Sequence, residues 1–220
     1  MEDHKTMEYL PLIIGWLLGI LSAIIVEKLK QRSEKKEIKK GIITELRDSQ
    51  IHLASICYVT SFDYGEFNVD FLKWWKPYYT RLINSGDYDY LSRNKAMFDK
   101  LFDLNETELS AYKNIVRANS NPKSSHIFKA MSTPYIDSKT GSISFFKEEY
   151  QSSLFKIKRE IEFINHYSEQ IWYYFTKTFD NPTQGNLQII NTNLDGTFSN
   201  VAKRSKRTVE LIEKFIKKYS

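Results

Sequence analysis

The chain has 220 residues, a formal net charge of +5 and an aromatic content of 15%. Its one cysteine, Cys57, excludes an intrachain disulfide framework and a zinc site built on several thiolates. Glycines are too widely spaced after residue 26 for a phosphate-binding or dinucleotide-binding loop. The positive charge lies at the two ends of the chain, which argues against a nucleic-acid-binding surface over the whole protein.

Residues 9–26, YLPLIIGWLLGILSAIIV, form an uncharged and almost wholly aliphatic run. As a helix this run would be about 27 Å long, close to the ~30 Å hydrocarbon core of a bilayer. We therefore predict a transmembrane helix over 9–26, preceded by a short extracytoplasmic segment, 1–8. Small residues recur every fourth position in it, and Gly15, Gly19 and Ala23 are the predicted oligomerisation surface.

A basic juxtamembrane stalk, 27–40, follows the predicted span. It contains seven lysine or arginine residues, whereas the N-terminal segment has one lysine and three acids. The positive-inside rule then places the C-terminal domain in the cytoplasm and the N-terminus outside. The predicted localisation is the cell inner membrane or cytoplasmic membrane, single-pass. A buried core helix and a cleaved signal peptide are the alternatives. The abrupt change to lysine argues against the first, and the acidic N-terminus against the second.

Residues 41–220 are predicted to form a cytoplasmic helical domain. The membrane helix is expected to continue through the stalk into it, because Ile42, Leu46, Leu53, Ile56 and Cys57 fall on one helical side. Asn68 or Asp70 is the expected cap of a second helix. This helix carries a cluster of aromatic residues, which we interpret mainly as core and alternatively as a partner interface or base-stacking platform: Trp74, Trp75, Tyr78 and Tyr79. Pro77 should kink or divide that helix.

The remaining periodicity predicts three more helices. One covers 96–116, with Met97 among its buried residues, and another covers 145–179. Between them, residues 119–141 are the longest expected loop. After a polar stretch containing the ambiguous segment 187–193, a final helix is expected from 201. The predicted fold is all-α, a bundle of about four or five helices on one membrane anchor.

The layout resembles a widespread set of uncharacterised bacterial membrane-anchored helical proteins. The resemblance rests on the span, the stalk, an I-x-x-E-L helix at Ile42–Leu46 and a W…SG…L segment at Trp75, Ser85-Gly86 and Leu91. It covers residues 1–118 and departs from the usual pattern at 48–50, where Asp-Ser-Gln replaces an expected asparagine. It supports this architecture and implies no known activity.

Two sets of chemically reactive residues invite a catalytic interpretation. Helical spacing places two trios on helix faces, although each trio points away from its apolar stripe: Glu45, Asp48 and His52, and Glu162, His166 and Glu169. We interpret both as solvated polar faces, and Cys57 as a small buried hydrophobe rather than a nucleophile. We therefore predict no catalytic, cofactor-binding or metal-binding residue and no enzyme activity.

The last twenty residues have a net charge of +5. Four basic residues expected on the outer side of this helix are candidates for binding anionic lipid headgroups or nucleic acid: Lys203, Arg204, Lys206 and Arg207. The leading functional interpretation is a membrane-tethered interaction module that binds a protein partner or itself. The alternative is a membrane-associated nucleic-acid sensor or phage-defence component that uses this basic helix. Nucleic acid is the less favoured partner.

Overall fold

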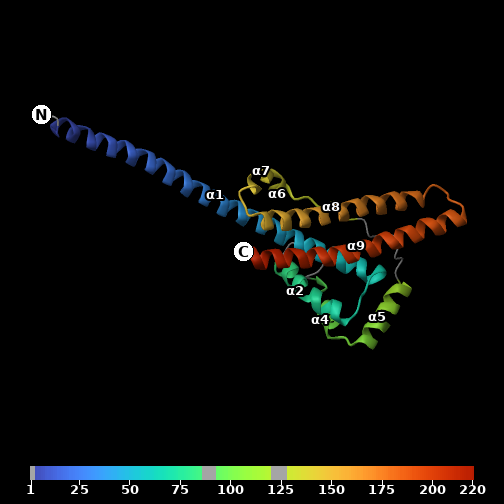
Figure 1. Cartoon of the computed structure of the whole chain (residues 1–220). Coiled ribbons are helices and arrows are strands. Elements are labelled where there is room, and N and C mark those ends of the chain that lie inside the picture. The colour runs from blue at the N-terminus through green and yellow to red at the C-terminus, as the bar shows by residue number, and fades with distance from the viewer. Residues whose placement is uncertain (1–2, 86–92, 120–127) are drawn as a thin grey trace.

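The computed structural model describes residues 3–85, 93–119 and 128–220, and in the first helix it describes side chains from Gly15 onward except Leu17. The described residues form eight helices and no strand, which confirms the predicted all-α class (Figure 1). The helices are α1 (Asp3–Tyr64), α2 (Val69–Ser85), α4 (Lys95–Asp103), α5 (Glu106–Asn119), α6 (Pro134–Ser138), α7 (Thr140–Ile143), α8 (Glu148–Lys177) and α9 (Gln184–Tyr219).

Helix α1 runs without a break through the predicted span, the stalk and the first core segment. This confirms the expected continuity. Every described side chain from Gly15 to Glu37 is exposed, and Ile38 is the first buried one. In Figure 1 this first half projects as a single rod, and only the second half enters the bundle.

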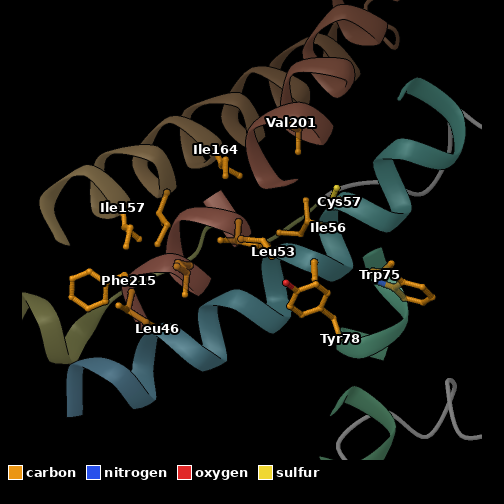
Figure 2. Packing of buried hydrophobic residues seen from close by; sticks show 14 of the residues in the cluster. Leu46, Leu53, Ile56, Cys57, Trp75, Tyr78, Ile157, Ile164, Val201 and Phe215 are labelled. Carbon is orange, nitrogen blue, oxygen red and sulfur yellow. The ribbon is translucent and has the colours of Figure 1, made fainter. Parts of the chain in front are cut away.

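Three long helices make the main core. Helix α9 packs along α1 on one side and along α8 on the other. The predicted stripes meet there: Leu46 and Leu53 of α1 are buried with Ile157 of α8 and Val201 and Phe215 of α9 (Figure 2). The described residues therefore form three long helices with five shorter ones packed around them, which is more than the four or five helices predicted.

Helix α2 adds the aromatic part of the core. The backbone N–H of Phe71 donates to the Asn68 side chain over 2.8 Å, so Asn68 is the cap. Trp75 is buried and stacks on Tyr58 of α1 with ring centroids 4.0 Å apart. The helix continues through the exposed Pro77, so the expected division there is wrong.

The predicted single helix 96–116 is two helices. Leu104 has extended backbone angles and ends α4. Asn105 then accepts from the N–H groups of Thr107 and Glu108, while the Glu108 carboxylate accepts from the Asn105 N–H over 2.9 Å. This reciprocal pair is a capping box, with Asn in the cap position, and it starts α5. The break also buries Phe98 in place of the expected Met97, which is 40% exposed.

The expected loop 119–141 is partly helical. Of its residues, 120–127 lie outside the described part, but α6 and α7 place Ile136 and Ile143 in the core. Glu45 holds this segment, because its two carboxylate oxygens accept from the backbone N–H groups of Tyr135 and Ile136, each over 2.8 Å. Glu45 is thus a helix cap supplied by another helix, and not a solvated residue as expected.

The last two helices form a long hairpin. Asn181, with a positive φ of 49°, and Pro182 make the turn between them. Thr183 accepts from the Asn186 N–H and caps α9. Helix α9 therefore begins at Gln184 and not near residue 201, and the ambiguous segment 187–193 is helical. On α8 the buried face includes Ile171, and Trp172 beside it is exposed.

Within the described residues, no helical segment combines the length and the hydropathy needed to cross a membrane. Part of the predicted span 9–26, namely the side chains of 9–14 and of Leu17, lies outside those residues.

We predict that Glu45→Ala lowers the free energy of unfolding of the full chain in neutral detergent by about 1–3 kcal/mol, because two partly buried N–H donors lose their acceptor. Chemical denaturation followed by circular dichroism measures this. Asp48→Ala, an exposed carboxylate one turn further along, is the matched control and should change stability by less than about 0.5 kcal/mol. Equal effects of the two changes would show that the Glu45 contacts add no stability.

Candidate functional site: a basic pocket and an exposed hairpin tip

The root of α1, where the projecting rod meets the bundle, is strongly basic. Spacings of three and four residues place Arg32, Lys35, Lys36 and Lys39 on neighbouring positions of the helix surface. They lie beside the corner between α7 and α8. Lys35 Nζ donates to the Phe145 carbonyl over 2.8 Å and lies 5.1 Å from the centre of the Phe146 ring. This contact joins the stalk to the end of the bundle.

A cavity of about 420 Å³ opens at this junction. We call it the basic pocket, and eight residues from α1, the α7–α8 corner, α8 and α9 line it: Arg32, Lys35, Lys36, Lys39, Phe146, Lys147, Tyr150 and Tyr219. Five of the eight carry a positive charge and none is acidic. Glu149, next to the lining residue Tyr150 in the chain, is paired with Lys218. The pocket therefore has a rim of cations without an anion among its lining residues.

The floor of the basic pocket is aromatic. Phe146 and Tyr150 are buried and stack with their ring centroids 4.4 Å apart, and Tyr150 also contacts Tyr219 at 4.9 Å. Burial raises the pKa of the Tyr150 phenol, so its hydroxyl stays neutral. Among the described residues, neither the Tyr150 nor the Tyr219 hydroxyl has a hydrogen-bond partner. The pocket thus combines an uncharged, largely apolar base with a cationic rim.

The corner between α7 and α8 lies beside the stalk of α1. Phe145 is 62% exposed, yet it lines a second cavity of about 410 Å³ whose other lining residues all belong to the stalk: Glu27, Lys28, Gln31, Arg32, Glu34 and Lys35. One exposed aromatic ring is therefore held beside the stalk, next to the basic pocket, since Arg32 and Lys35 line both cavities.

The opposite end of the bundle exposes apolar side chains. We call this the hairpin tip, at the far right in Figure 1, and define it by Trp172, Tyr173, Phe179, Leu187 and Ile189. Between residues 170 and 194 the only charged residues are Lys177 and Asp180, which pair with each other over 2.8 Å. A shallow cavity of about 380 Å³ lies between the two helices here. The tip is consequently both apolar and electrically neutral.

The four basic residues predicted on α9 do not form one free surface. Arg204 Nη1 lies 2.8 Å from Oε2 of the buried Glu160, and its guanidinium lies 4.6 Å from the Phe163 ring centre. Lys206 lies over the half-buried Trp74 at 5.6 Å. Arg207 is 3.9 Å from Glu160, and Lys203 is exposed. Arg204 therefore makes a structural contact, and the prediction that this face binds lipid headgroups or nucleic acid stays a prediction. The buried Glu160 gave no signal in the sequence.

The other predicted site residues are distributed as follows. Trp75, Tyr78 and Tyr79 are buried, so the aromatic cluster belongs to the core, with Trp74 half-buried at its edge. Gly15, Gly19 and Ala23 are exposed on the rod, and a Cβ added at either glycine meets open space. The oligomerisation surface stays a prediction.

The two acidic–histidine trios are not brought together as a site. Glu45 is committed to α6, and no group of three or more His, Cys, Asp or Glu residues in the described chain has the geometry for a metal ion. Cys57 is buried, and its thiol donates to the Ala202 carbonyl over 3.4 Å. Burial raises its pKa from 9.0 to about 12, which leaves no thiolate for nucleophilic chemistry near neutral pH.

Comparison of the chain with family models, curated proteins and solved structures gave no match. The function is therefore argued from the chain's own residues.

We predict that Arg204→Gln lowers the free energy of unfolding by about 3–5 kcal/mol, because the buried Glu160 carboxylate loses its close partner. Lys203→Gln, the adjacent exposed cation, should cost less than about 0.5 kcal/mol. The double change Glu160→Met with Arg204→Met should recover most of the loss, since it removes both charges. Denaturation of the full chain in neutral detergent measures all three. An Arg204→Gln effect as small as that of Lys203→Gln would show that the pair is not needed for stability.

The raised pKa of Cys57 predicts a loss of stability in alkali. The unfolded thiol loses its proton near pH 9, whereas the folded thiol keeps it to about pH 12. Between these values the unfolded state binds fewer protons, so the thiol lowers the free energy of unfolding by about 1.4 kcal/mol per pH unit. The difference between the wild type and Cys57→Ala, measured from pH 8 to 11, isolates this contribution from the tyrosines. A constant difference over that range would contradict the assignment.

Proposed function

We propose that the chain is a membrane-tethered, non-enzymatic interaction module that binds a protein through the hairpin tip at the inner face of the cytoplasmic membrane. The observation that carries the proposal is the neutral, apolar tip at the far end of the bundle from the projecting rod. Exposed apolar side chains that gather on one surface of a folded protein are typical of interaction sites.

The rod supports the tether. Eight large apolar side chains between Trp16 and Leu29 are exposed on it, with no other part of the bundle against them. Leaving such surface in water costs about 25 cal/mol per Å², so a lipid environment suits this rod better than water. The basic stalk follows directly, as expected for the cytoplasmic side of an anchor.

The tip favours a partner of complementary chemistry. Phe179 and Ile189 are 69% and 61% exposed, and the single Lys177–Asp180 pair leaves no net charge there. We therefore propose a protein partner whose contact surface is apolar and uncharged. Close packing of two rods through Gly15, Gly19 and Ala23 would place two tips at equal depth below the membrane, so self-association is part of the same proposal.

The alternative, nucleic-acid binding through α9, has less support. Arg204 and Arg207 are paired with Glu160, and Lys206 lies against Trp74, so three of the four expected cations already have protein partners. Release of a captured partner by nuclease treatment would nevertheless favour it over the protein-binding proposal.

We predict that Phe179→Ser with Ile189→Ser lowers binding of the tip's partner by at least tenfold, because the change removes two apolar side chains from the proposed contact surface. Both side chains are exposed, so the fold does not depend on them. The partner is identified by crosslinking the tagged full chain in its native membranes, then purified and titrated against the wild type and the variant.

The matched control is Met97→Ser with Ile115→Ser, which removes two exposed apolar side chains from α4 and α5. It should leave binding within about twofold of the wild type. Equal binding by both double variants would overturn the tip as the docking surface. Capture of only a second copy of this chain would assign the tip to self-association.

A further inference from the structure

The basic pocket is not used by the proposed docking at the tip, and its lining has a marked chemical preference. Five cations surround it without an acidic residue among them. Within the described part of the chain, Arg32 and Lys36 make no hydrogen bond or ion pair, although Glu27 and Glu34 line the neighbouring cavity with Arg32. A ligand that carries negative charge and several acceptor oxygens satisfies this rim, as a phosphate group does.

The floor narrows the choice of ligand. Phe146 and Tyr150 present ring surface rather than charged groups at the base of the pocket. A free phosphate ion is fully hydrated and gains nothing from an aromatic base. A phosphate that is attached to an apolar body uses both the rim and the floor. The pocket therefore fits an anionic amphiphile better than a small inorganic anion.

The end of the pocket nearest the proposed anchor lies close to the depth of lipid headgroups. Arg32 is six residues beyond Val26, or about 9 Å along the helix, and the headgroup layer extends about 5–8 Å beyond the hydrocarbon. Helical side chains slant toward the N-terminus of their helix, which on α1 is the side of the proposed anchor. Long arginine and lysine side chains at the root therefore reach back toward the headgroups.

We propose that the basic pocket binds the phosphate of an anionic phospholipid of the inner leaflet, with Arg32, Lys35, Lys36 and Lys147 around the phosphate and the aromatic floor against the adjoining apolar part. This inference rests on the proposed membrane anchor. The exposed Phe145, held beside Lys28 and Arg32, lies on the same side and adds an aromatic contact of the kind found at membrane interfaces.

A specific lipid site gives the stalk a role beyond orientation by charge. One lipid would contact α1, the α7–α8 corner and the end of α9 together, because all three line the pocket. Binding would therefore hold the bundle at a defined angle to the membrane, and the hairpin tip at a defined depth.

The test uses the full chain reconstituted in phosphatidylcholine nanodiscs that contain increasing fractions of phosphatidylglycerol. Native mass spectrometry of the chain released from the discs counts the phosphatidylglycerol molecules that stay bound. We expect the wild type to retain phosphatidylglycerol in preference to phosphatidylcholine. Arg32→Gln with Lys36→Gln should weaken this retention about 5- to 30-fold, as expected for the loss of two contacts near an anionic surface.

The matched control is Lys30→Gln with Lys40→Gln. It removes the same charge from the same stalk, but neither residue lines the basic pocket. It should stay within about twofold of the wild type, and circular dichroism should show both variants folded. Equal weakening by the two double variants would overturn the pocket in favour of unspecific attraction.

Further outcomes distinguish a failure of the lipid site from a failure of the membrane anchor. Displacement of the lipid by millimolar glycerol 3-phosphate would show a site for free phosphate compounds and would overturn the lipid assignment. Extraction of the wild-type chain from vesicles by alkaline carbonate would refute the membrane anchor, and the lipid proposal would fail with it. Stable insertion together with no lipid preference would refute the pocket alone.

Discussion

The continuity of α1 is the constraint on which the rest of the structure depends. One uninterrupted ladder of backbone hydrogen bonds joins the exposed apolar rod, the basic root and the core segment that contains Leu46 and Leu53. These parts cannot rotate independently, because each residue advances the helix surface by a fixed angle. The face of α1 that packs on α9 therefore determines which stalk residues meet the α7–α8 corner. The basic pocket is a consequence of this register, and the hairpin tip lies at the end of the bundle away from the rod for the same reason.

Buried polar contacts define how the other elements sit on α1. Glu160 is an acid within the α8–α9 packing and needs Arg204 beside it, so this pair specifies one relative position of the two helices. Glu45 does the same for α6 through two backbone N–H groups. Apolar stripes tolerate small sliding movements, whereas these hydrogen bonds do not. The corner that carries Phe145 and Lys147 is consequently held beside the stalk.

The two ends of the bundle offer different chemistry to different partners. The basic pocket pairs cations with an aromatic floor, which suits an anionic amphiphile, and the hairpin tip is apolar with its one ion pair internally balanced. In the proposed arrangement a lipid sets the angle of the bundle and a protein meets its far end. The long α8–α9 hairpin lies between the two sites and keeps them apart.

Periodicity along the chain is enough to determine the all-α class, the continuous first helix and the inner stripe of α1, because these depend on local spacing and backbone chemistry. The capping box Asn105–Glu108 separates α4 from α5, and helical periodicity alone does not reveal this break because the apolar spacing continues across it. Tertiary structure alone decided that Glu45 caps α6, that Glu160 is buried against Arg204, and that Arg32 meets Phe146 and Tyr219 around one cavity. These partners are separated by between 44 and 187 positions in the chain, and only the packing of α1, α8 and α9 brings them together.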